Sequence, residues 1–317
     1  MTCRNLVWIS LLSVIALPFS TAVAQTAPEL DLIDLQAEEV AVVPTNSLIW
    51  EVRTPGQDQV SYIYGILFKM PAAEFFLPTG IDRLIEQTDK LVMEVDPLAH
   101  NLDHIHRGTI PLDSTLEELL PKKTFQQLNR YVKDSLSELA TYKMQTRYAP
   151  LLLARQFICD YCLGFGKDQT PISYETYLAK KIKKPLKLLH TGWARTAWLD
   201  SYNFAEQTEV LMTSVDDRAI QCEVYRAMMR AYRRQNLDQM WLLSKDAPDM
   251  GDNGSRFIEA RNQSWVESLV WSLKVENLFI AVNAVQLPGE YGLLHLLRKA
   301  GFQVNPVYLP IPQGNDE

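Results

Sequence analysis

The sequence predicts an α/β fold, with a central β-sheet flanked by helices and a helical insertion in the middle of the chain. Two observations lead to this prediction. Short apolar runs with strand character stand near both ends of the chain, whereas the middle shows long helical patterns. The chain also has 317 residues, of which 47% are hydrophobic, so it can build one large core or two closely packed halves.

Six segments have strand character; the one at 278–285 is apolar, and the one at 90–95 reads as buried. The predicted strands are, in order, 48–52, 60–67, 90–95, 185–189, 278–285 and 303–308. No repeat of fixed period is visible. The end of the second strand, Tyr-Gly-Ile-Leu-Phe at 64–68, is nevertheless loosely similar to the end of the fifth, Asn-Ala-Val-Gln at 283–286.

Helical patterns connect these strands and fill the middle of the chain. The predicted helices are 80–88, 116–139, 150–162, 173–183, about 194–246, 256–273 and 291–299. The last one follows a Leu-Pro-Gly-Glu turn and is closed by Gly301, which suits a helix C-terminus. Two basic runs, 180–184 and 230–234, fall near helix ends, where cations favour the helix dipole. We interpret both as solvated helix ends and not as a binding patch.

The beginning of the chain has the features of a secretory signal peptide. Arg4 provides a weak positive charge, residues 6–17 form an apolar run, and Ala-Val-Ala at 22–24 is a small-residue cleavage site. We therefore expect residues 1–24 to be removed and the protein to be periplasmic or secreted. No Cys follows the cleavage site, so we expect no lipid anchor. No other apolar run is long enough for a transmembrane segment after cleavage.

The mature chain is divided into an acidic, flexible tail at 25–46 and a folded domain at 47–312. The formal net charge is −7, and it becomes about −8 when the one positive charge of Arg4 is removed with the signal peptide. An acidic protein repels polyanions, so nucleic acid is not an expected partner.

Three cysteines remain after cleavage, which allows at most one intramolecular disulfide. Cys159 and Cys162 have the spacing of a redox motif, but they stand on a helical pattern with no strand before it. We therefore expect one structural disulfide, either between this pair or from one of them to Cys222. The pairing stays open at this level.

Two carboxylates, Glu94 and Asp96, stand at the end of the third predicted strand, where their i, i+2 spacing places them on one face. Like charges in this arrangement share a cation or raise each other's pKa. The alternative is structural: one carboxylate caps the loop before Pro97, and the other pairs with an arginine. Arg261, which precedes Asn262 on a predicted helix, is the candidate partner for either carboxylate.

The histidines leave a metal site open but do not require one. The run His-Asn-Leu-Asp-His-Ile-His at 100–106 has three imidazoles, yet it lies in a polar connection without cysteines, so a solvated loop is the simpler interpretation. His295 reads as a surface or partly packed residue. Sequence motifs of serine hydrolases, zinc proteases and phosphate-binding loops are absent from the chain.

Four segments together resemble the TraB/GumN family, which is related to TIKI-type metalloproteases. They are Leu-Ile-Trp-Glu-Val at 48–52, Tyr-Ile-Tyr-Gly at 62–65 followed by Phe75 and Pro78, the strand at 91–96, and Arg-Asn at 261–262 leading to Leu-Pro-Gly-Glu-Tyr-Gly-Leu-Leu at 287–294. The last segment is the most specific. The resemblance covers about residues 48–310 and implies a sheet made of two related halves between helices.

The resemblance also implies a divalent metal centre, because each half of the family's sheet ends a strand with Gly-x-x-His. In this chain the first motif is Gly65-Ile-Leu-Phe68, followed by Lys69, and the second is Asn283-Ala-Val-Gln286. Both histidines are replaced, and the second motif has lost its Gly as well. A phenyl ring has no lone pair for a metal, and a neutral amide is a poor ligand for zinc or manganese. We therefore expect no metal cofactor.

The residues still in register with the family mark the same site. We expect Glu94, Asp96, Arg261 and Asn262 at the position of the catalytic centre, and a ligand-binding cleft around it. The residues expected to line that cleft are Glu51, Gly65, Phe68, Lys69, Asn283, Gln286 and Glu290. Arg261 or Lys69 would neutralise the carboxylates in place of a metal.

The favoured hypothesis is a non-catalytic family member that binds a peptide or small molecule. The alternative is a metal-dependent hydrolase or peptidase whose ligands are Glu94, Asp96 and Gln286 with His190 or His100. In that case His190 should lie near Glu94. A carboxylate site for calcium or magnesium is a further variant. A third hypothesis, an accessory factor for polysaccharide export or conjugation, follows from the family names alone.

Overall fold

Six strands form one mixed sheet with the order β6-β4-β7-β2-β1-β8. We describe a computed structural model of the chain over residues 46–98, 114–136, 138–145, 149–163, 171–189, 202–245 and 254–312. The strands are β1 (Ile49–Arg53), β2 (Val60–Ile66), β4 (Lys90–Met93), β6 (Leu186–Leu188), β7 (Leu278–Asn283) and β8 (Gln303–Val307). Each lies within or one residue beyond a predicted segment, so the predicted α/β class is confirmed.

The sheet is parallel in one part and antiparallel in the other. β6, β4, β7 and β2 are parallel to their neighbours, and β1 is antiparallel to both β2 and β8. The carboxyl ends of the four parallel strands therefore lie along one edge of the sheet. A separate two-stranded ladder, β3 (Met70–Pro71) with β5 (Pro171–Ile172), was not predicted, because two residues show no periodicity.

The helices between these strands follow the predicted pattern, but the predicted segments 116–139 and 194–246 are each divided into several helices. They are α1 (Ile81–Glu86), α2 (Leu116–Leu119), α3 (Lys122–Ser135), α4 (Glu138–Gln145), α5 (Pro150–Cys162), α6 (Tyr174–Lys181), α7 (Phe204–Asp216), α8 (Arg218–Arg233), α9 (Leu237–Lys245), α10 (Gly254–Leu273) and α11 (Leu293–Lys299). The single helix predicted at 116–139 is wrong. Leu120 is extended and Pro121 begins a new helix, because proline disfavours helical backbone before it and cannot donate inside a helix.

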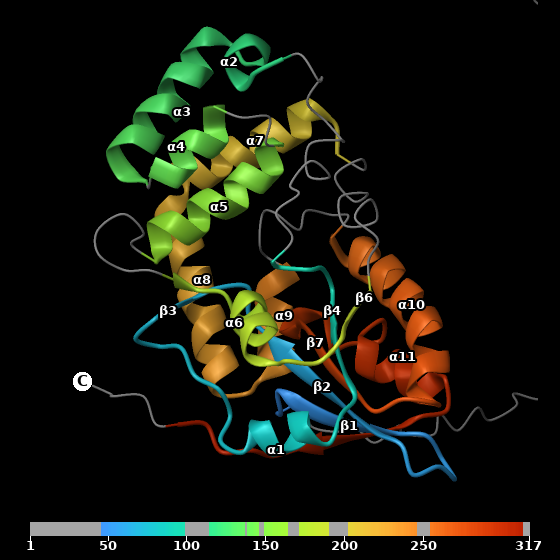
Figure 1. Cartoon of the computed structure of the whole chain (residues 1–317). Helices are drawn as coiled ribbons and strands as arrows, with labels where there is room; N and C mark the ends of the chain where they lie inside the picture. The colour runs from blue at the N-terminus through green and yellow to red at the C-terminus, as the bar shows by residue number, and fades with distance from the viewer. Residues whose placement is uncertain are drawn as a thin grey trace, which may run out of the picture. The chain divides into compact units, whose positions relative to one another are not determined.

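Helices cover both faces of the sheet. On one face Tyr62 donates to Gln87 beside α1, and Tyr64 contacts Tyr174 of α6 and Tyr232 of α8. On the other face the guanidinium of Arg298 in α11 lies 5.4 Å from the ring of Trp50. Figure 1 shows α10 and α11 together on that second side. The result is a three-layer arrangement with the sheet in the middle.

The described residues contain two large hydrophobic cores and a small third cluster around Ala149 and Leu151. The larger surrounds the sheet and includes Trp50, Trp265 and Phe279, whereas the second joins α2, α3, α5 and α7 through Leu128, Phe157 and Leu211. Helix α5 belongs to both, since Phe157 lies in the second core and Cys159 in the first. A disulfide between Cys162 of α5 and Cys222 of α8 reinforces this junction. One of the two pairings left open by the sequence is thus confirmed, and Cys159 is buried outside it.

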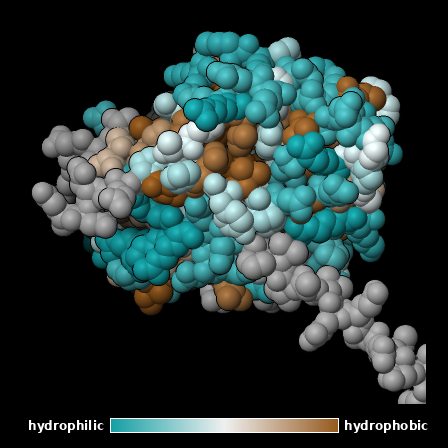
Figure 2. All heavy atoms as spheres, turned by 90° about the horizontal axis from the view of Figure 1, so that it is seen from below, coloured by the Kyte–Doolittle hydropathy of each residue, from teal (hydrophilic) through white to brown (hydrophobic). Residues whose placement is uncertain are grey.

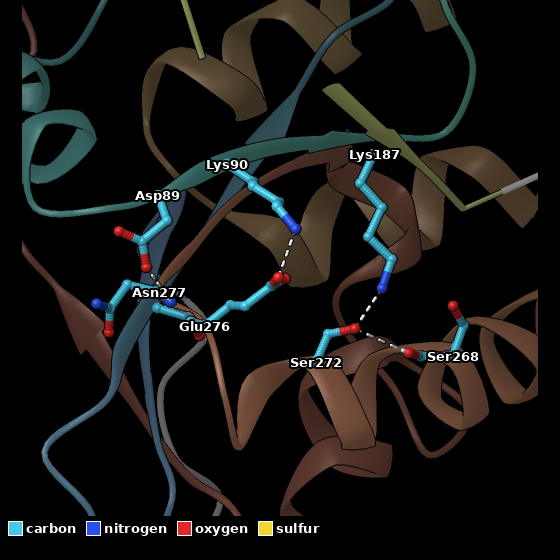
Figure 3. Close-up of polar contacts among 8 residues, drawn as sticks. Asp89, Lys90, Lys187, Ser268, Ser272, Glu276 and Asn277 are labelled. Carbon is cyan, nitrogen blue, oxygen red and sulfur yellow. Dashed lines mark hydrogen bonds and ion pairs between the residues drawn. The ribbon is translucent and has the colours of Figure 1, made fainter. Parts of the chain in front are cut away.

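Polar contacts hold α10 and β7 to the amino ends of the parallel strands (Figure 3). The ammonium of Lys187 in β6 contacts the Ser272 hydroxyl in the last turn of α10, where a cation favours the helix dipole. Lys90 of β4 forms an ion pair with Glu276, and the Asn277 amide donates to Asp89 at 2.9 Å. These contacts position β7 before it enters the sheet.

The surface below α1 combines polar and apolar residues. Figure 2 shows this side, where apolar residues gather in the middle of an otherwise hydrophilic face. The segment that follows β8 is tied to the residues before α1, since the Thr79 amide donates to the Pro310 carbonyl at 2.8 Å. Its residues Leu309 and Ile311 are partly buried against the sheet core. Within the described part of the chain, every helix is too short or too polar to cross a membrane.

Candidate functional site

The carboxyl ends of β2, β4 and β7 bring most of the predicted site residues to one place. Ile66 pairs with Asn283, and Met93 pairs with Ala281, so the residues that follow each strand leave the sheet at the same edge. Ligands of open α/β sheets bind outside this edge. The two predicted motif segments, 65–68 and 283–286, belong to the neighbouring strands β2 and β7 and are therefore adjacent.

Glu94 is the centre of this edge. Its Oε1 atom accepts from the Asn283 amide at 2.9 Å, and its Oε2 atom lies 3.4 Å from Nη1 of Arg261. The side chains of Glu94 and Arg261 are only 12% and 13% exposed, so this ion pair is screened less than a surface pair. The guanidinium of Arg261 also lies 5.7 Å from the ring of the buried Trp265. The pair expected of Arg261 is thus made with Glu94.

Asp96 has a different role. Its Oδ1 atom accepts from the Leu98 amide at 2.9 Å, which closes a short turn across Pro97. The prediction that Glu94 and Asp96 share one face of a strand is wrong, because β4 ends at Met93 and the chain bends immediately afterwards. The arrangement matches the structural alternative, in which one carboxylate caps the loop and the other pairs with an arginine.

Asn262 clamps the loop that follows β7. Its side chain is fully buried and its Nδ2 atom donates to the Gln286 carbonyl at 2.9 Å and the Tyr291 carbonyl at 2.8 Å. The loop also needs two of its glycines. Gly289 has φ +88°, and a Cβ atom on Gly292 would lie 2.2 Å from the Pro288 carbonyl oxygen. These requirements explain why the Pro-Gly-Glu-Tyr-Gly segment is so specific.

The two amides of the second motif differ in what they bind. Asn283 Oδ1 accepts from the Val285 amide at 3.1 Å and so caps a short 3₁₀ turn, η3 (Ala284–Gln286), which the sequence did not reveal. Gln286 is buried within this turn. Its Oε1 atom and the Oδ1 atom of Asn262 are buried and accept no hydrogen bond from the described residues. Such orphaned acceptors cost free energy and concentrate here at the predicted site.

Gly65 and Phe68 represent the first motif. A Cβ atom on Gly65 would lie 2.8 Å from Leu287 Cδ1 and 3.2 Å from the Ala284 backbone, so only glycine lets η3 approach β2 this closely. Phe68 is 44% exposed, and the Lys69 ammonium lies 5.1 Å from its ring centroid. Lys69 is also positioned through its carbonyl, which accepts from the Tyr225 hydroxyl at 2.7 Å.

Other predicted site residues lie elsewhere. Glu51 forms an ion pair with Arg53 at 2.6 Å. In the sheet Glu51 pairs with Tyr62, and Tyr62 pairs with Phe279, which lies four residues before Asn283 in β7. That offset is about 13 Å along the strand direction. Glu290 is exposed on the loop after β7. His190 and the histidines at 100–106, which were considered as metal ligands, lie outside the described residues. His295 is exposed on α11.

Among the described residues, those at this edge do not fit a divalent transition metal. Both oxygens of Glu94 already have partners, Phe68 has no donor atom, and the Gln286 amide oxygen is buried inside η3. Among the described residues, no group of three or more His, Cys, Asp or Glu side chains converges on one point. The chemistry that the edge offers is a neutralised carboxylate, a set of fixed backbone groups and exposed apolar side chains.

The Glu94–Arg261 pair predicts a large loss of stability when one partner is removed. We expect Arg261→Ala to lower the free energy of unfolding by about 3 kcal/mol, because it leaves the Glu94 carboxylate buried without its counter-charge. Arg53→Ala, which breaks an Arg–Glu pair whose arginine is 42% exposed, is the matched control and should cost less than about 1 kcal/mol. Urea denaturation measures both. Equal losses would contradict a buried role for Glu94.

The two amides of the edge should respond oppositely to an apolar replacement. Asn262→Leu removes the donor of two carbonyls and should cost about 2–3 kcal/mol. Gln286→Leu removes an acceptor that has no partner among the described residues, so stability should stay constant or rise by about 1 kcal/mol. Thermal unfolding of the two variants compares them directly. A destabilised Gln286→Leu protein would show that the Gln286 amide has a partner in solution.

The comparison with known families agrees with this geometry. The sequence profile of the TraB/PrgY/gumN family matches residues 48–306, which include every described element from β1 to α11 and all of β8 except its last residue. Searches of curated proteins and of solved structures give no significant match. Because the matched region is most of the chain and contains the whole edge built around Glu94 and Asn262, this chain belongs to the TraB/PrgY/gumN family.

Proposed function

We propose that this chain is a non-catalytic member of its family that binds a peptide or small molecule at the carboxyl edge of its sheet. The observation that carries the proposal is that both carboxylate oxygens of Glu94 already have protein partners. In place of a cation, the carboxylate has the Arg261 guanidinium on one oxygen and the Asn283 amide on the other. The framework of the site is retained, whereas the donors expected of a metal centre are not.

Arg261 supports this reading on electrostatic grounds. A partly buried carboxylate needs a positive partner, and a guanidinium held over Trp265 supplies one permanently, since it does not deprotonate in proteins. Free carboxylate oxygens are what a divalent cation requires as ligands. With Arg261 and the Asn283 amide in place, Glu94 serves to fix α10 and β7 against β4.

The exposed side chains of the edge indicate the kind of ligand. Each of the four parallel strands ends in or is followed by an exposed apolar or aromatic residue: Leu188 for β6, Leu98 for β4, Tyr291 for β7 and Phe68 for β2. Side chains of this kind, above a set of fixed backbone groups, are typical of surfaces that bind apolar side chains of a partner. A peptide with apolar residues suits this edge better than a highly charged ligand.

The proposed location is the periplasm or the extracellular space. The signal peptide expected at 1–24 supports it, and so does the disulfide between Cys162 and Cys222, because structural disulfides persist in oxidising compartments. A metal-dependent hydrolase with a non-standard ligand set is the competing function. Its proposed ligands His100 and His190 lie outside the described residues, so the experiment below addresses that function directly.

Metal retention distinguishes the two functions. Residues 25–317 are equilibrated with zinc, manganese, cobalt or calcium, desalted and analysed by elemental mass spectrometry. We expect less than about 0.1 equivalent in the wild type, and stoichiometric zinc or manganese in a Phe68→His plus Gln286→His variant, because imidazole is a strong ligand for these ions. Tyr177→His plus Tyr308→His, at two exposed positions away from the edge, controls for added imidazole.

Stoichiometric transition metal in the wild type would reject the non-catalytic function in favour of the hydrolase. Calcium alone, retained at that level, would assign a carboxylate site and would also contradict the ion pair described above as the resting state of Glu94. Retention by the control variant to the same degree as by the edge variant would show that the edge has no special geometry for a metal.

Peptide selection tests the binding function itself. A random peptide library displayed on phage is selected against the oxidised wild-type protein, and affinities of the recovered synthetic peptides are measured by calorimetry. We expect peptides enriched in apolar residues, and Phe68→Ser plus Tyr291→Ser should weaken them at least about tenfold, since two aromatic contacts are lost. The control is Tyr308→Ser, which changes a more exposed tyrosine directly after β8 and should leave these affinities unchanged. If only the Tyr308→Ser protein lost peptide affinity, the peptides would bind away from this edge, and the proposed binding site would be wrong.

A further inference from the structure

The loop that carries Phe68 is held from outside the sheet. Between the end of β2 at Ile66 and the start of β3 at Met70, the Lys69 carbonyl accepts from the Tyr225 hydroxyl of α8 at 2.7 Å. Burial raises the pKa of Tyr225 above its ordinary value, so this hydroxyl keeps its proton and remains a donor at neutral pH. The position of the loop therefore depends on where α8 places Tyr225.

The position of α8 depends in turn on a covalent bond. Cys222 lies three residues before Tyr225, so the two side chains are on the same side of α8, one turn apart. Cys222 is buried and forms the disulfide with Cys162 at the end of α5. Movement of α5 along α8 at this point is thus prevented directly beneath the residue that holds the loop.

A second connection returns from the loop to α5. Met70 and Pro71 of β3 pair with Ile172 and Pro171 of β5. In the chain, β5 begins nine residues after Cys162 (171 minus 162). The loop, β3, β5, the end of α5, the disulfide and one turn of α8 therefore form a closed ring of covalent and hydrogen-bonded contacts. Opening any member of such a ring weakens the restraint on the others.

We propose that the Cys162–Cys222 disulfide positions the Phe68–Lys69 loop, with Tyr225 as the positioning residue that connects the two. The edge of the sheet is then sensitive to thiol reductants. Reduction by a dithiol transfers two electrons and two protons to the sulfurs of Cys162 and Cys222, and the reductant leaves as its own disulfide. Cys162 is the partly exposed member of the pair, so it is the sulfur that a reductant reaches.

Hydrogen–deuterium exchange of the segment 66–78 tests the proposal without any ligand. All proteins carry Cys159→Ala, which prevents an alternative disulfide. Two variants are compared with the oxidised parent: Cys162→Ala plus Cys222→Ala, and Tyr225→Phe. Each should speed exchange of the segment about fivefold, which corresponds to one lost hydrogen bond. The combined variant should be no faster than either one, because both open the same ring.

The matched control is Tyr131→Phe. It removes a buried tyrosine hydroxyl that has no hydrogen-bond partner among the described residues and that lies in the second core. This change should leave exchange of 66–78 constant.

Any of three results would overturn the proposal: constant exchange of 66–78 in the folded Cys162→Ala plus Cys222→Ala protein, constant exchange in the oxidised Tyr225→Phe protein, or additive effects in the combined variant. If loss of the disulfide opens the whole chain, which circular dichroism would show, the disulfide has a global role in place of the local one proposed, and the proposal is overturned as well. The exchange experiment contains no ligand, so its result is independent of the peptide-binding test. The positioning role of the disulfide can fail while the edge binds peptides, and peptide binding can fail while the disulfide positions the loop.

Discussion

The carboxyl edge of the sheet, where the candidate site lies, depends on one partly buried carboxylate. Glu94 connects three elements, since it stands at the end of β4, accepts from the first amide beyond the apolar run of β7 and pairs with Arg261 of α10. The cost of desolvating a carboxylate is recovered only when its partners are well placed. Helix α10 meets this condition because its buried stripe, which includes Ile258, Trp265 and Leu269, fixes its rotation against the sheet and so directs Arg261 towards Glu94.

The same helix controls the loop after β7. Asn262 follows Arg261, and on a helix the two side chains point about 100° apart. One therefore reaches the carboxylate, and the other reaches the carbonyls of Gln286 and Tyr291. In this arrangement a pair of residues that sequence reasoning associates with catalysis serves to hold an edge in shape.

Around this edge the chain combines rigid and exposed parts. Backbone groups are fixed by Asn262, Asn283 and the glycines at 65 and 292, whereas Phe68, Leu98 and Tyr291 present apolar surface to solvent. Exposed side chains on a fixed framework lose little entropy on binding and so favour recognition. A metal centre would instead require donors that converge, and here the polar groups that converge already satisfy one another, apart from the two buried amide oxygens.

The sequence by itself determined the fold class, the six strands of the sheet and the family, because apolar runs and turn residues are local signals that survive without tertiary contacts. It also led us to expect the loss of both motif histidines, and it named Arg261 as a partner for a carboxylate. Only the tertiary structure decided between Glu94 and Asp96, because β4 ends at Met93, and the strand alternation that made them look equivalent stops before both residues. Strand register likewise separated Glu51 from the edge, and the long-range contact between Cys162 and Cys222 settled the disulfide. The helix break at Pro121, the turn η3 and the β3–β5 ladder are short or follow from contacts distant in sequence, so no periodic pattern could reveal them.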